Sequence, residues 1–154
     1  MRTLAIVGLA FSLAFAGAAL AEGLKPTSVE DTKKFLADAA VEKGAVKTPS
    51  GLIYIEMTPG TGPKPKASSR VKVHYSGTLI DGKEFDSSYS NGQPASFRLN
   101  EVIPCWTEGL QRMKVGGKSK LICPADIAYG SRGAGGVIPP NAALVFEVEL
   151  LRVD

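Results

Sequence analysis

Apolar and polar side chains alternate between Arg70 and Ile80, and this period of two predicts a β-strand with one buried face and one outer face. Residues 144–153 alternate in the same way, with Leu144 and Phe146 on the face opposite Val145. The chain around these segments is rich in turn-forming residues, with 17 Gly and 10 Pro in 154 residues. Because Gly and Pro favour turns and interrupt helices, the pattern favours a sheet protein with many loops over a helical bundle.

Shorter segments give the expected order of the remaining elements. Asp81-Gly82 predicts a hairpin turn after the first long strand, and Gly116-Gly117 predicts the end of a short helix. The expected fold class is α+β, a twisted antiparallel sheet that forms a half-barrel around one short central helix, with a further helix in front. The segments are strands at 52–57, 97–99 and 119–123, a helix at 107–113, an irregular stretch at 85–91 and a long loop at 125–141.

Residues 22–49 are expected to form an N-terminal extension with one amphipathic helix. Ser28 is a suitable N-cap, Asp31 stands at the capping-box position, and Lys43-Gly44 predicts the end of the helix. The apolar stripe of this helix packs on its own domain, or on a second copy in a dimer, unless the helix is a loose tether. Since the extension is too short for a separate dimerisation domain, we expect a monomer or a weak dimer. The stripe consists of Phe35, Leu36, Ala39 and Ala40.

Residues 1–21 have the pattern of a secretory signal peptide. Arg2 supplies the positive start, an uncharged and mostly apolar run follows, and Ala19-Leu20-Ala21 matches the small-x-small cleavage pattern before Glu22. The alternative is an uncleaved membrane anchor, although the apolar run is slightly shorter than the ~20 residues that a spanning helix needs. We therefore expect a periplasmic or secreted protein that does not associate with the membrane after cleavage.

The two cysteines, Cys105 and Cys123, fit an oxidising compartment. They have no C-x-x-C spacing, and neither lies in a motif typical of a nucleophile. In an exported protein the simplest interpretation is one structural disulfide, which would stabilise the fold by roughly 3 kcal/mol. The alternative is two small buried thiols that never meet.

The sequence gives no reason to expect a metal, a cofactor or a nucleic-acid partner. His74 is the single histidine, so His74 and the two cysteines are too few for a zinc site. The formal net charge is +3, and a nucleic-acid-binding domain would need a basic stripe or face. We expect His74 to be an outward strand residue without a catalytic role.

Four segments carry a family resemblance by their content and their order. The segments are Val-His-Tyr-Ser-Gly at 73–77, Phe-Asp-Ser-Ser at 85–88, Val-Ile-Pro-Cys-Trp-Thr-Glu-Gly at 102–109, and Ala-Tyr-Gly at 128–130 followed by Ile-Pro-Pro-Asn-Ala at 138–142 and Leu-Val-Phe-Glu-Val-Glu-Leu at 144–150. Together they resemble the FKBP-type peptidyl-prolyl cis-trans isomerases. The resemblance covers residues 50–154, and residues 48–62 also resemble the entry to this domain in the exported bacterial branch of macrophage infectivity potentiators and FkpA. Members of that branch usually carry a larger helical dimerisation region in front of the domain.

The resemblance implies an aromatic pocket for a prolyl ring. Trp106 would form its floor, and Tyr75, Phe85 and Phe146 its walls, with Val102 in the lining. From spacing alone, Tyr75, Phe146 and Trp106 are ordinary core residues of a sheet or a helix. For these three residues, the family pattern favours a role in the pocket over a role as ordinary core residues.

The resemblance also implies the polar groups of the site. The Ile103 backbone N–H and the Tyr129 hydroxyl would donate hydrogen bonds to substrate carbonyls. Asp86 would lie at the rim, where its carboxylate orients the pocket or meets the twisted amide. Ile138 would cover one side of the site and meet the residue before proline. Without the family pattern, Asp86 and Tyr129 are equally compatible with plain turns.

The activity implied is rotation about X-Pro amides during the folding of exported proteins. Resonance sets a barrier of about 18–20 kcal/mol, which a site lowers by holding the twisted amide better than the planar one. This requires no nucleophile, metal or cofactor. The expected partners are proline-containing polypeptides, and macrolide inhibitors are candidate ligands.

Two other functions are compatible with this sequence, and it departs from the family pattern at two positions. These functions are a chaperone-like binding module with little turnover, and a secreted interaction protein with a vestigial pocket. Ala95 stands where many members have an aromatic residue, which would lower one pocket wall. Cys105 stands where Gly is common between Pro104 and Trp106.

Overall fold

The computed structural model describes residues 28–154 of the chain. The expected signal peptide at 1–21 and the start of the N-terminal extension lie outside the described residues. Within the described part, no helix is both long and apolar enough to cross a membrane.

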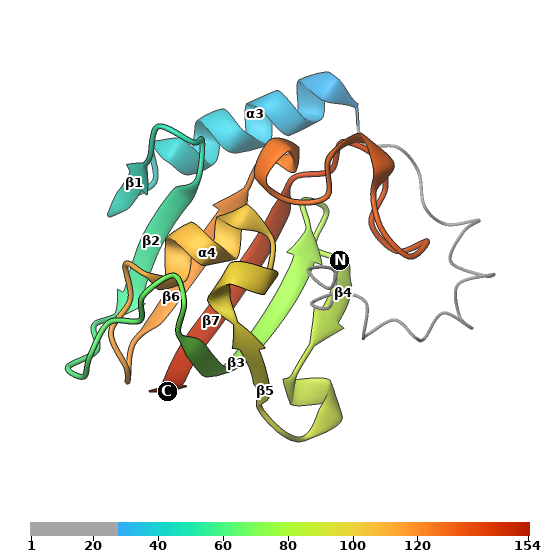
Figure 1. The fold of residues 1–154 in the computed structure, drawn as a ribbon. Helices are drawn as coiled ribbons and strands as arrows, with labels where there is room; N and C mark the ends of the chain where they lie inside the picture. Colours follow the sequence, from blue (N-terminus) through green and yellow to red (C-terminus); the bar gives the residue numbers. More distant parts are fainter. Residues whose placement is uncertain (1–27) are drawn as a thin grey trace.

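A seven-stranded sheet with only antiparallel neighbours organises the described chain (Figure 1). Its order is β1-β2-β6-β7-β3-β4, and β5 pairs with the part of β3 that β4 leaves free. The sheet encloses one short helix, which confirms the predicted α+β class. The strands are β1 (Ala45–Lys47), β2 (Ile53–Thr58), β3 (Arg70–Leu79), β4 (Glu84–Ser87), β5 (Ala95–Arg98), β6 (Lys118–Cys123) and β7 (Leu144–Val153).

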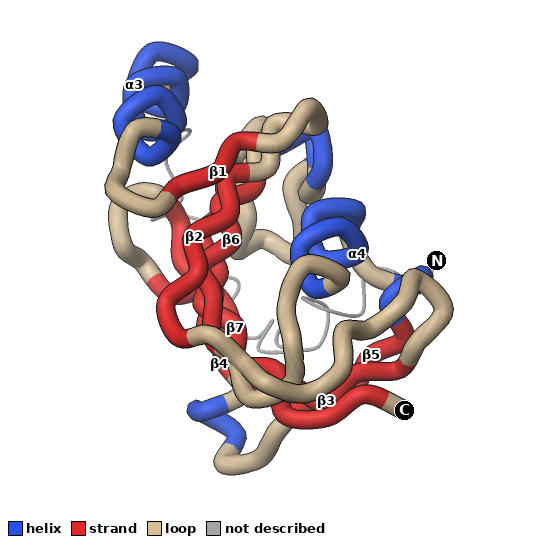
Figure 2. Tube along the Cα trace, turned by 90° about the vertical axis from the view of Figure 1, so that its left-hand side faces the viewer, coloured by secondary structure: helices blue, strands red, loops and turns tan. Residues whose placement is uncertain are grey.

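Two helices lie on opposite faces of the sheet (Figure 2). Helix α4 (Pro104–Leu110) packs on the inner face, where Trp106 and Leu110 are 0% exposed. Helix α3 (Val29–Ala40) packs on the outer face, where its apolar stripe meets Ile53 of β2 and Ile122 of β6. The stripe therefore packs on its own domain, the first of the alternatives that the sequence left open.

The two long strands have the alternation that the sequence predicts. Val71, Val73 and Tyr75 of β3 are buried, whereas Lys72 and the other alternate residues are partly exposed. Strand β7 alternates between buried and half-buried positions through most of its length. Because β3 and β7 are neighbours along almost their whole length, their buried residues form a continuous inner wall.

The limits of both helices differ from the predicted ones, although the predicted N-cap of α3 is present. Ser28 caps α3 as expected, since its Oγ accepts a hydrogen bond from the Asp31 N–H at 2.9 Å. That helix ends at Ala40, before the predicted stop at Lys43-Gly44. Helix α4 begins at Pro104 and ends at Leu110, so the predicted range of 107–113 was wrong. Proline at the first turn fits the helical φ and removes a backbone donor that would have no partner.

Three strand assignments also needed correction. Residues 84–87 form β4, where an irregular stretch was predicted, because pairing with β3 matches Ser76 to Ser87 and Gly77 to Asp86. Strand β5 begins at Ala95 and ends at Arg98, where the sequence predicted 97–99. Strand β1 was not predicted. These short elements are defined by their pairing with a neighbouring strand, which the periodicity of so few residues does not reveal.

The predicted disulfide is present and joins α4 to the end of β6. The Cα atoms of Cys105 and Cys123 are 5.8 Å apart, within the usual range for such bonds, and both residues are 0% exposed. Among residues 28–154, no group of His, Cys, Asp and Glu side chains is placed to hold a metal ion.

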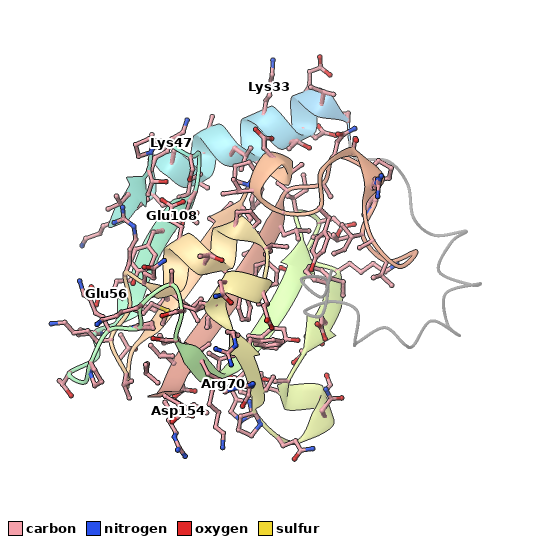
Figure 3. All side chains as sticks on the ribbon, in the orientation of Figure 1. Lys33, Lys47, Glu56, Arg70, Glu108 and Asp154 are labelled. Atoms are coloured by element: carbon pink, nitrogen blue, oxygen red, sulfur yellow. A yellow bond between two sulfur atoms is a disulfide. The ribbon has the colours of Figure 1, made fainter. Side chains whose placement is uncertain are left out.

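Polar contacts tie the ends of the domain together. The Ser50 hydroxyl donates a hydrogen bond to a carboxylate oxygen of Glu108 on α4, and Figure 3 labels Glu108. Arg70 at the start of β3 and Asp154 lie side by side (Figure 3), because their backbones exchange hydrogen bonds of 3.2 and 2.8 Å. The entry segment is therefore fixed to α4, and the last residue is fixed to β3.

Candidate active site

Trp106 is the centre of an aromatic cluster on the inner face of the sheet. Its ring meets those of Tyr75, Phe97 and Phe146 edge to face, at centroid distances of 5.2, 5.5 and 5.4 Å. The three partners come from β3, β5 and β7, which are neighbours in the sheet. Edge-to-face pairs at these distances are favourable beyond the area that they bury, so the cluster is a firmly packed part of the inner core.

Phe85 of β4 extends the cluster on one side. Its ring meets Phe146 edge to face at 5.6 Å, and its side chain is half-buried. Gly77 of β3 makes this arrangement possible, because a Cβ atom there would lie 2.6 Å from the Phe85 ring and 2.9 Å from the Phe146 ring. The glycine therefore leaves the space that both rings occupy.

A buried carboxylate lies beside the cluster. The Tyr75 hydroxyl donates a hydrogen bond of 2.6 Å to Oδ2 of Asp86, and the Ser87 N–H donates one of 2.9 Å to Oδ1. Asp86 is only 6% exposed, so its carboxylate is held inward by Tyr75 and does not lie at an open rim. The register of β3 with β4 produces this pair, because Gly77 stands opposite Asp86.

Burial changes the acidity of this group and of its neighbours. It raises the pKa of Asp86 to about 6, although the hydrogen bonds from Tyr75 and Ser87 act in the opposite direction. Burial also raises the pKa of Tyr75 and of Tyr129, and the nearby Asp86 charge raises both further. The two phenols therefore keep their protons and act as hydrogen-bond donors.

Several buried donors at the site have no acceptor. Within the described part of the chain, neither the Tyr129 hydroxyl nor Nε1 of Trp106 has a hydrogen-bond partner. The backbone N–H of Ile103, the N-cap of α4, likewise donates to no group among residues 28–154. A buried donor without a partner costs about 1–3 kcal/mol, so such groups in a native structure need an explanation. An arriving acceptor is one explanation.

Ile138 belongs to a loop that lies next to the cluster. A pair of hydrogen bonds of 2.9 and 3.0 Å between Ala134 and Ile138 holds this loop in a tight hairpin. Ile138 is 3% exposed and packs into the inner core. It also lines a hollow of about 230 Å³, together with Arg132, Ala134, Gly135, Gly136, Pro139 and Pro140.

The structure brings the expected site residues together in one region. The inner core contains Tyr75, Val102, Ile103, Trp106, Ile138 and Phe146, and Phe85 and Tyr129 pack against it. Asp86 joins them through Tyr75.

Sequence reasoning missed two contributors. Phe97 is part of the cluster because it stands opposite Val71 in the register of β3 with β5. In a strand, residues two positions apart share a face, so its position two residues after Ala95, which the family pattern places at a pocket wall, could have indicated this. Ser88 is 1% exposed, and its hydroxyl accepts a hydrogen bond of 2.8 Å from the Tyr75 N–H. On the outer face, His74 contacts the same hydroxyl at 2.8 Å and stacks on Tyr89.

Comparison with known families identifies the family of the domain that carries this cluster. The family described as FKBP-type peptidyl-prolyl cis-trans isomerase matches residues 62–151, which include the whole aromatic cluster. The chain belongs to this family. The FKBP-type segment ends within β7 and begins before β3, so it contains every element that carries a site residue.

Individual relatives place the chain among bacterial FKBP-type proteins. It is 55% identical over 130 residues to the FKBP-type peptidyl-prolyl cis-trans isomerase FkpA of Aeromonas hydrophila, which covers 82% of this chain and 48% of that protein. It is 48% identical over 119 residues to the outer membrane protein MIP of Legionella longbeachae, with coverage of 77% and 51%. The crystal structure of FkpA from Escherichia coli superposes with a TM-score of 0.79 at 53% identity, covering 81% of this chain and 58% of that one.

The chain spans about half the length of the curated relatives that it matches. The predicted resemblance to the FkpA and macrophage infectivity potentiator branch is confirmed by these relatives.

The raised pKa of Asp86 predicts a stability effect in this FKBP-type domain. The folded state holds its proton up to about pH 6, whereas the unfolded chain loses it near the ordinary value of 3.8. As the pH rises between these values, the free energy of unfolding should therefore fall, by roughly 3 kcal/mol at most, and then level off. Urea unfolding of wild type and Asp86→Asn from pH 4 to 7 measures this. The asparagine variant should lack the fall, and parallel pH curves for the two proteins would contradict the burial argument.

Proposed function

We propose that this chain is a peptidyl-prolyl cis-trans isomerase that acts on X-Pro bonds of exported polypeptides. The observation that carries the proposal is a pair of donors without a partner among the described residues, the Ile103 N–H and the Tyr129 hydroxyl, beside the aromatic cluster around Trp106. An apolar surface next to two free donors suits an X-Pro segment, which offers an apolar ring and backbone carbonyls but has no N–H on its proline nitrogen.

The proline ring would bind against the aromatic cluster. Tyr75, Trp106 and Phe146 form a continuous buried surface, and Phe85 and Tyr129 are the half-buried members at which a ligand would enter. Burying the ring stabilises the complex, because each Å² of apolar surface removed from water contributes about 25 cal/mol of free energy. Val102 and Ile138 would enclose the ring and the residue before it.

The two donors would hold the backbone on either side of the rotating bond. The Ile103 N–H and the Tyr129 hydroxyl can each donate to a substrate carbonyl without giving up a partner among residues 28–154. Fixing these carbonyls while the amide between them turns orients the chain for rotation. Resonance is lost in the twisted amide, so a site that fits this geometry and excludes water lowers the barrier.

Asp86 would act on the same step through its position beside Tyr75. Its carboxylate accepts the Tyr75 hydrogen bond and fixes the ring that forms one wall. Its charge also lies near the Tyr129 hydroxyl, whose pKa it raises. Asp86 therefore favours the protonated, donating form of Tyr129.

The location of action is proposed to be outside the cytoplasm. The predicted signal peptide at 1–21 supports this location, and so does the disulfide, since such bonds persist in oxidising compartments. The name of the Legionella relative, an outer membrane protein, points the same way.

A proline-limited refolding assay tests the proposed function. Catalytic amounts of this protein should accelerate the slow phase of a substrate protein whose folding waits for an X-Pro bond, which otherwise takes tens to hundreds of seconds. An unchanged slow phase together with reduced aggregation would contradict the proposal. That outcome would instead support a binding module that holds clients without turnover.

Replacing Tyr129 by phenylalanine should weaken catalysis without destabilising the fold. The change removes one hydrogen bond to substrate, and a neutral hydrogen bond contributes about 0.5–1.5 kcal/mol, so kcat/KM should fall roughly two- to tenfold. Because the hydroxyl is buried without a partner in the described structure, the free energy of unfolding should stay the same or rise. Peptide isomerisation and urea unfolding measure the two effects. A loss of stability with unchanged kcat/KM would show that the hydroxyl serves the fold.

A further inference from the structure

The Cys105–Cys123 disulfide lies between the two segments that carry the unpaired donors. Cys105 is two positions after Ile103 and directly precedes Trp106 in α4. Cys123 is the last residue of β6, and one short segment connects it to Tyr129. One covalent bond therefore joins the segment of the Ile103 N–H to the segment of the Tyr129 hydroxyl.

Few other groups hold the first turn of α4. The N-cap Ile103 makes no side-chain capping bond, and Pro104 has no N–H to donate. The polar ties of the helix come later, where the Thr107 hydroxyl donates to the Leu99 carbonyl and Glu108 accepts from Ser50. At the end that carries Ile103, the helix is held by the apolar packing of Ile103 and Trp106 and by the disulfide.

The segment between Cys123 and Tyr129 is itself well defined. A 3-10 helix at Ala125–Ile127 follows Pro124, with Ile127 donating to the Pro124 carbonyl at 3.1 Å and Ala128 to the Ala125 carbonyl at 2.9 Å. A shift at the end of β6 would therefore be carried to Tyr129 and not be absorbed by a loose loop.

We propose that Cys105 and Cys123 are positioning residues for X-Pro rotation. This inference rests on the proposed function. Their bond keeps the Ile103 N–H and the Tyr129 hydroxyl at the separation at which both can bind one substrate backbone. A misplacement of about 1 Å in such a pair can cost up to a hundredfold in rate. Both cysteines are 0% exposed, so in the folded protein the bond is shielded from solvent and from reductants dissolved in it.

The same chain in its oxidised and reduced forms gives the most closely matched comparison. The protein is unfolded, reduced, and refolded with reductant present, and both forms are assayed on a proline peptide at low temperature. The fluorescence of Trp106, the single tryptophan, checks that both are folded. We expect kcat/KM to be roughly three- to tenfold lower in the reduced form. We also expect faster amide hydrogen exchange at 102–106 and 124–129 in that form, a readout that does not depend on activity.

Two variants separate positioning from stability. The double variant Cys105→Ala/Cys123→Val removes the bond and keeps apolar side chains at both positions. Its kcat/KM should be lowered as much as that of the reduced form, both with and without reductant. If the reduced form does not fold, the double variant takes its place in the comparison. Phe35→Ala weakens only the outer cluster and should lower stability but not kcat/KM.

Equal kcat/KM and equal amide exchange in the oxidised and reduced forms would overturn the inference. A loss of kcat/KM in Phe35→Ala as large as that in the reduced form would also overturn it, because destabilisation alone would then explain the loss. If the oxidised protein does not catalyse isomerisation at all, the proposed function fails. The exchange comparison then decides alone whether the disulfide positions the two segments.

Discussion

Replacement of Asp86 by alanine is expected to lower kcat/KM for X-Pro isomerisation roughly 10- to 100-fold. The change removes the carboxylate that accepts the 2.6 Å hydrogen bond from Tyr75 and leaves that buried hydroxyl without a partner. An unsatisfied buried group costs about 1–3 kcal/mol, and the Tyr75 ring would turn to find another acceptor. If the displaced ring costs the transition state a similar free energy, kcat/KM falls by the expected factor. Peptide isomerisation with matched protein concentrations measures it.

Asp86→Asn is the matched control for this loss. Asparagine keeps the size of the side chain and an oxygen that can accept the Tyr75 hydrogen bond, but it removes the negative charge. An intermediate loss would assign part of the effect to the hydrogen bond and the rest to the charge near Tyr129. If Asp86→Ala keeps full kcat/KM, the carboxylate has no part in the reaction, and the role proposed for it is wrong.

Replacement of Trp106 by alanine is expected to cost about 3–5 kcal/mol of the free energy of unfolding. Trp106 is 0% exposed and meets three other rings edge to face, so its removal leaves a cavity between the helix and the sheet. Domains of this size are stable by only about 5–15 kcal/mol, so the variant should be close to unfolding at moderate temperature. Urea unfolding followed by circular dichroism measures the change.

Trp106→Phe serves as the control for packing. Phenylalanine keeps an aromatic ring against Tyr75 and Phe146 and removes Nε1, which has no partner within residues 28–154. The loss of stability should therefore be clearly smaller than for alanine. A cost below about 1 kcal/mol for Trp106→Ala would mean that the indole is not the packed centre of the domain.

The parts of the fold that follow from local pattern were predictable from the sequence. The alternation of β3 and β7 places Tyr75 and Phe146 on the inner face, and Ser28 caps α3 where expected. These features depend on residues within a few positions of one another. Their physical basis, the period of two in a strand and the free N–H groups at a helix start, is fully contained in the segment.

The parts that depend on strand register were not predictable in the same way. Residues 84–87 became β4, and Phe97 joined the cluster, because each pairs with a part of β3. The Tyr75–Asp86 hydrogen bond has the same origin, since the register of β3 with β4 sets the separation of the two side chains. The family pattern made Asp86 an expected site residue, but only the structure showed that its carboxylate is buried and bound to Tyr75.

The most direct test of the account measures the rotation itself. Exchange spectroscopy by NMR on a short X-Pro peptide follows cis and trans signals of the peptide while the indole N–H signal of Trp106 reports binding. The account predicts accelerated exchange together with a shifted Trp106 signal, and loss of the acceleration in Asp86→Ala. A shifted Trp106 signal with no acceleration by the wild-type protein would contradict the account, because the aromatic cluster would then bind proline without lowering the barrier to its rotation.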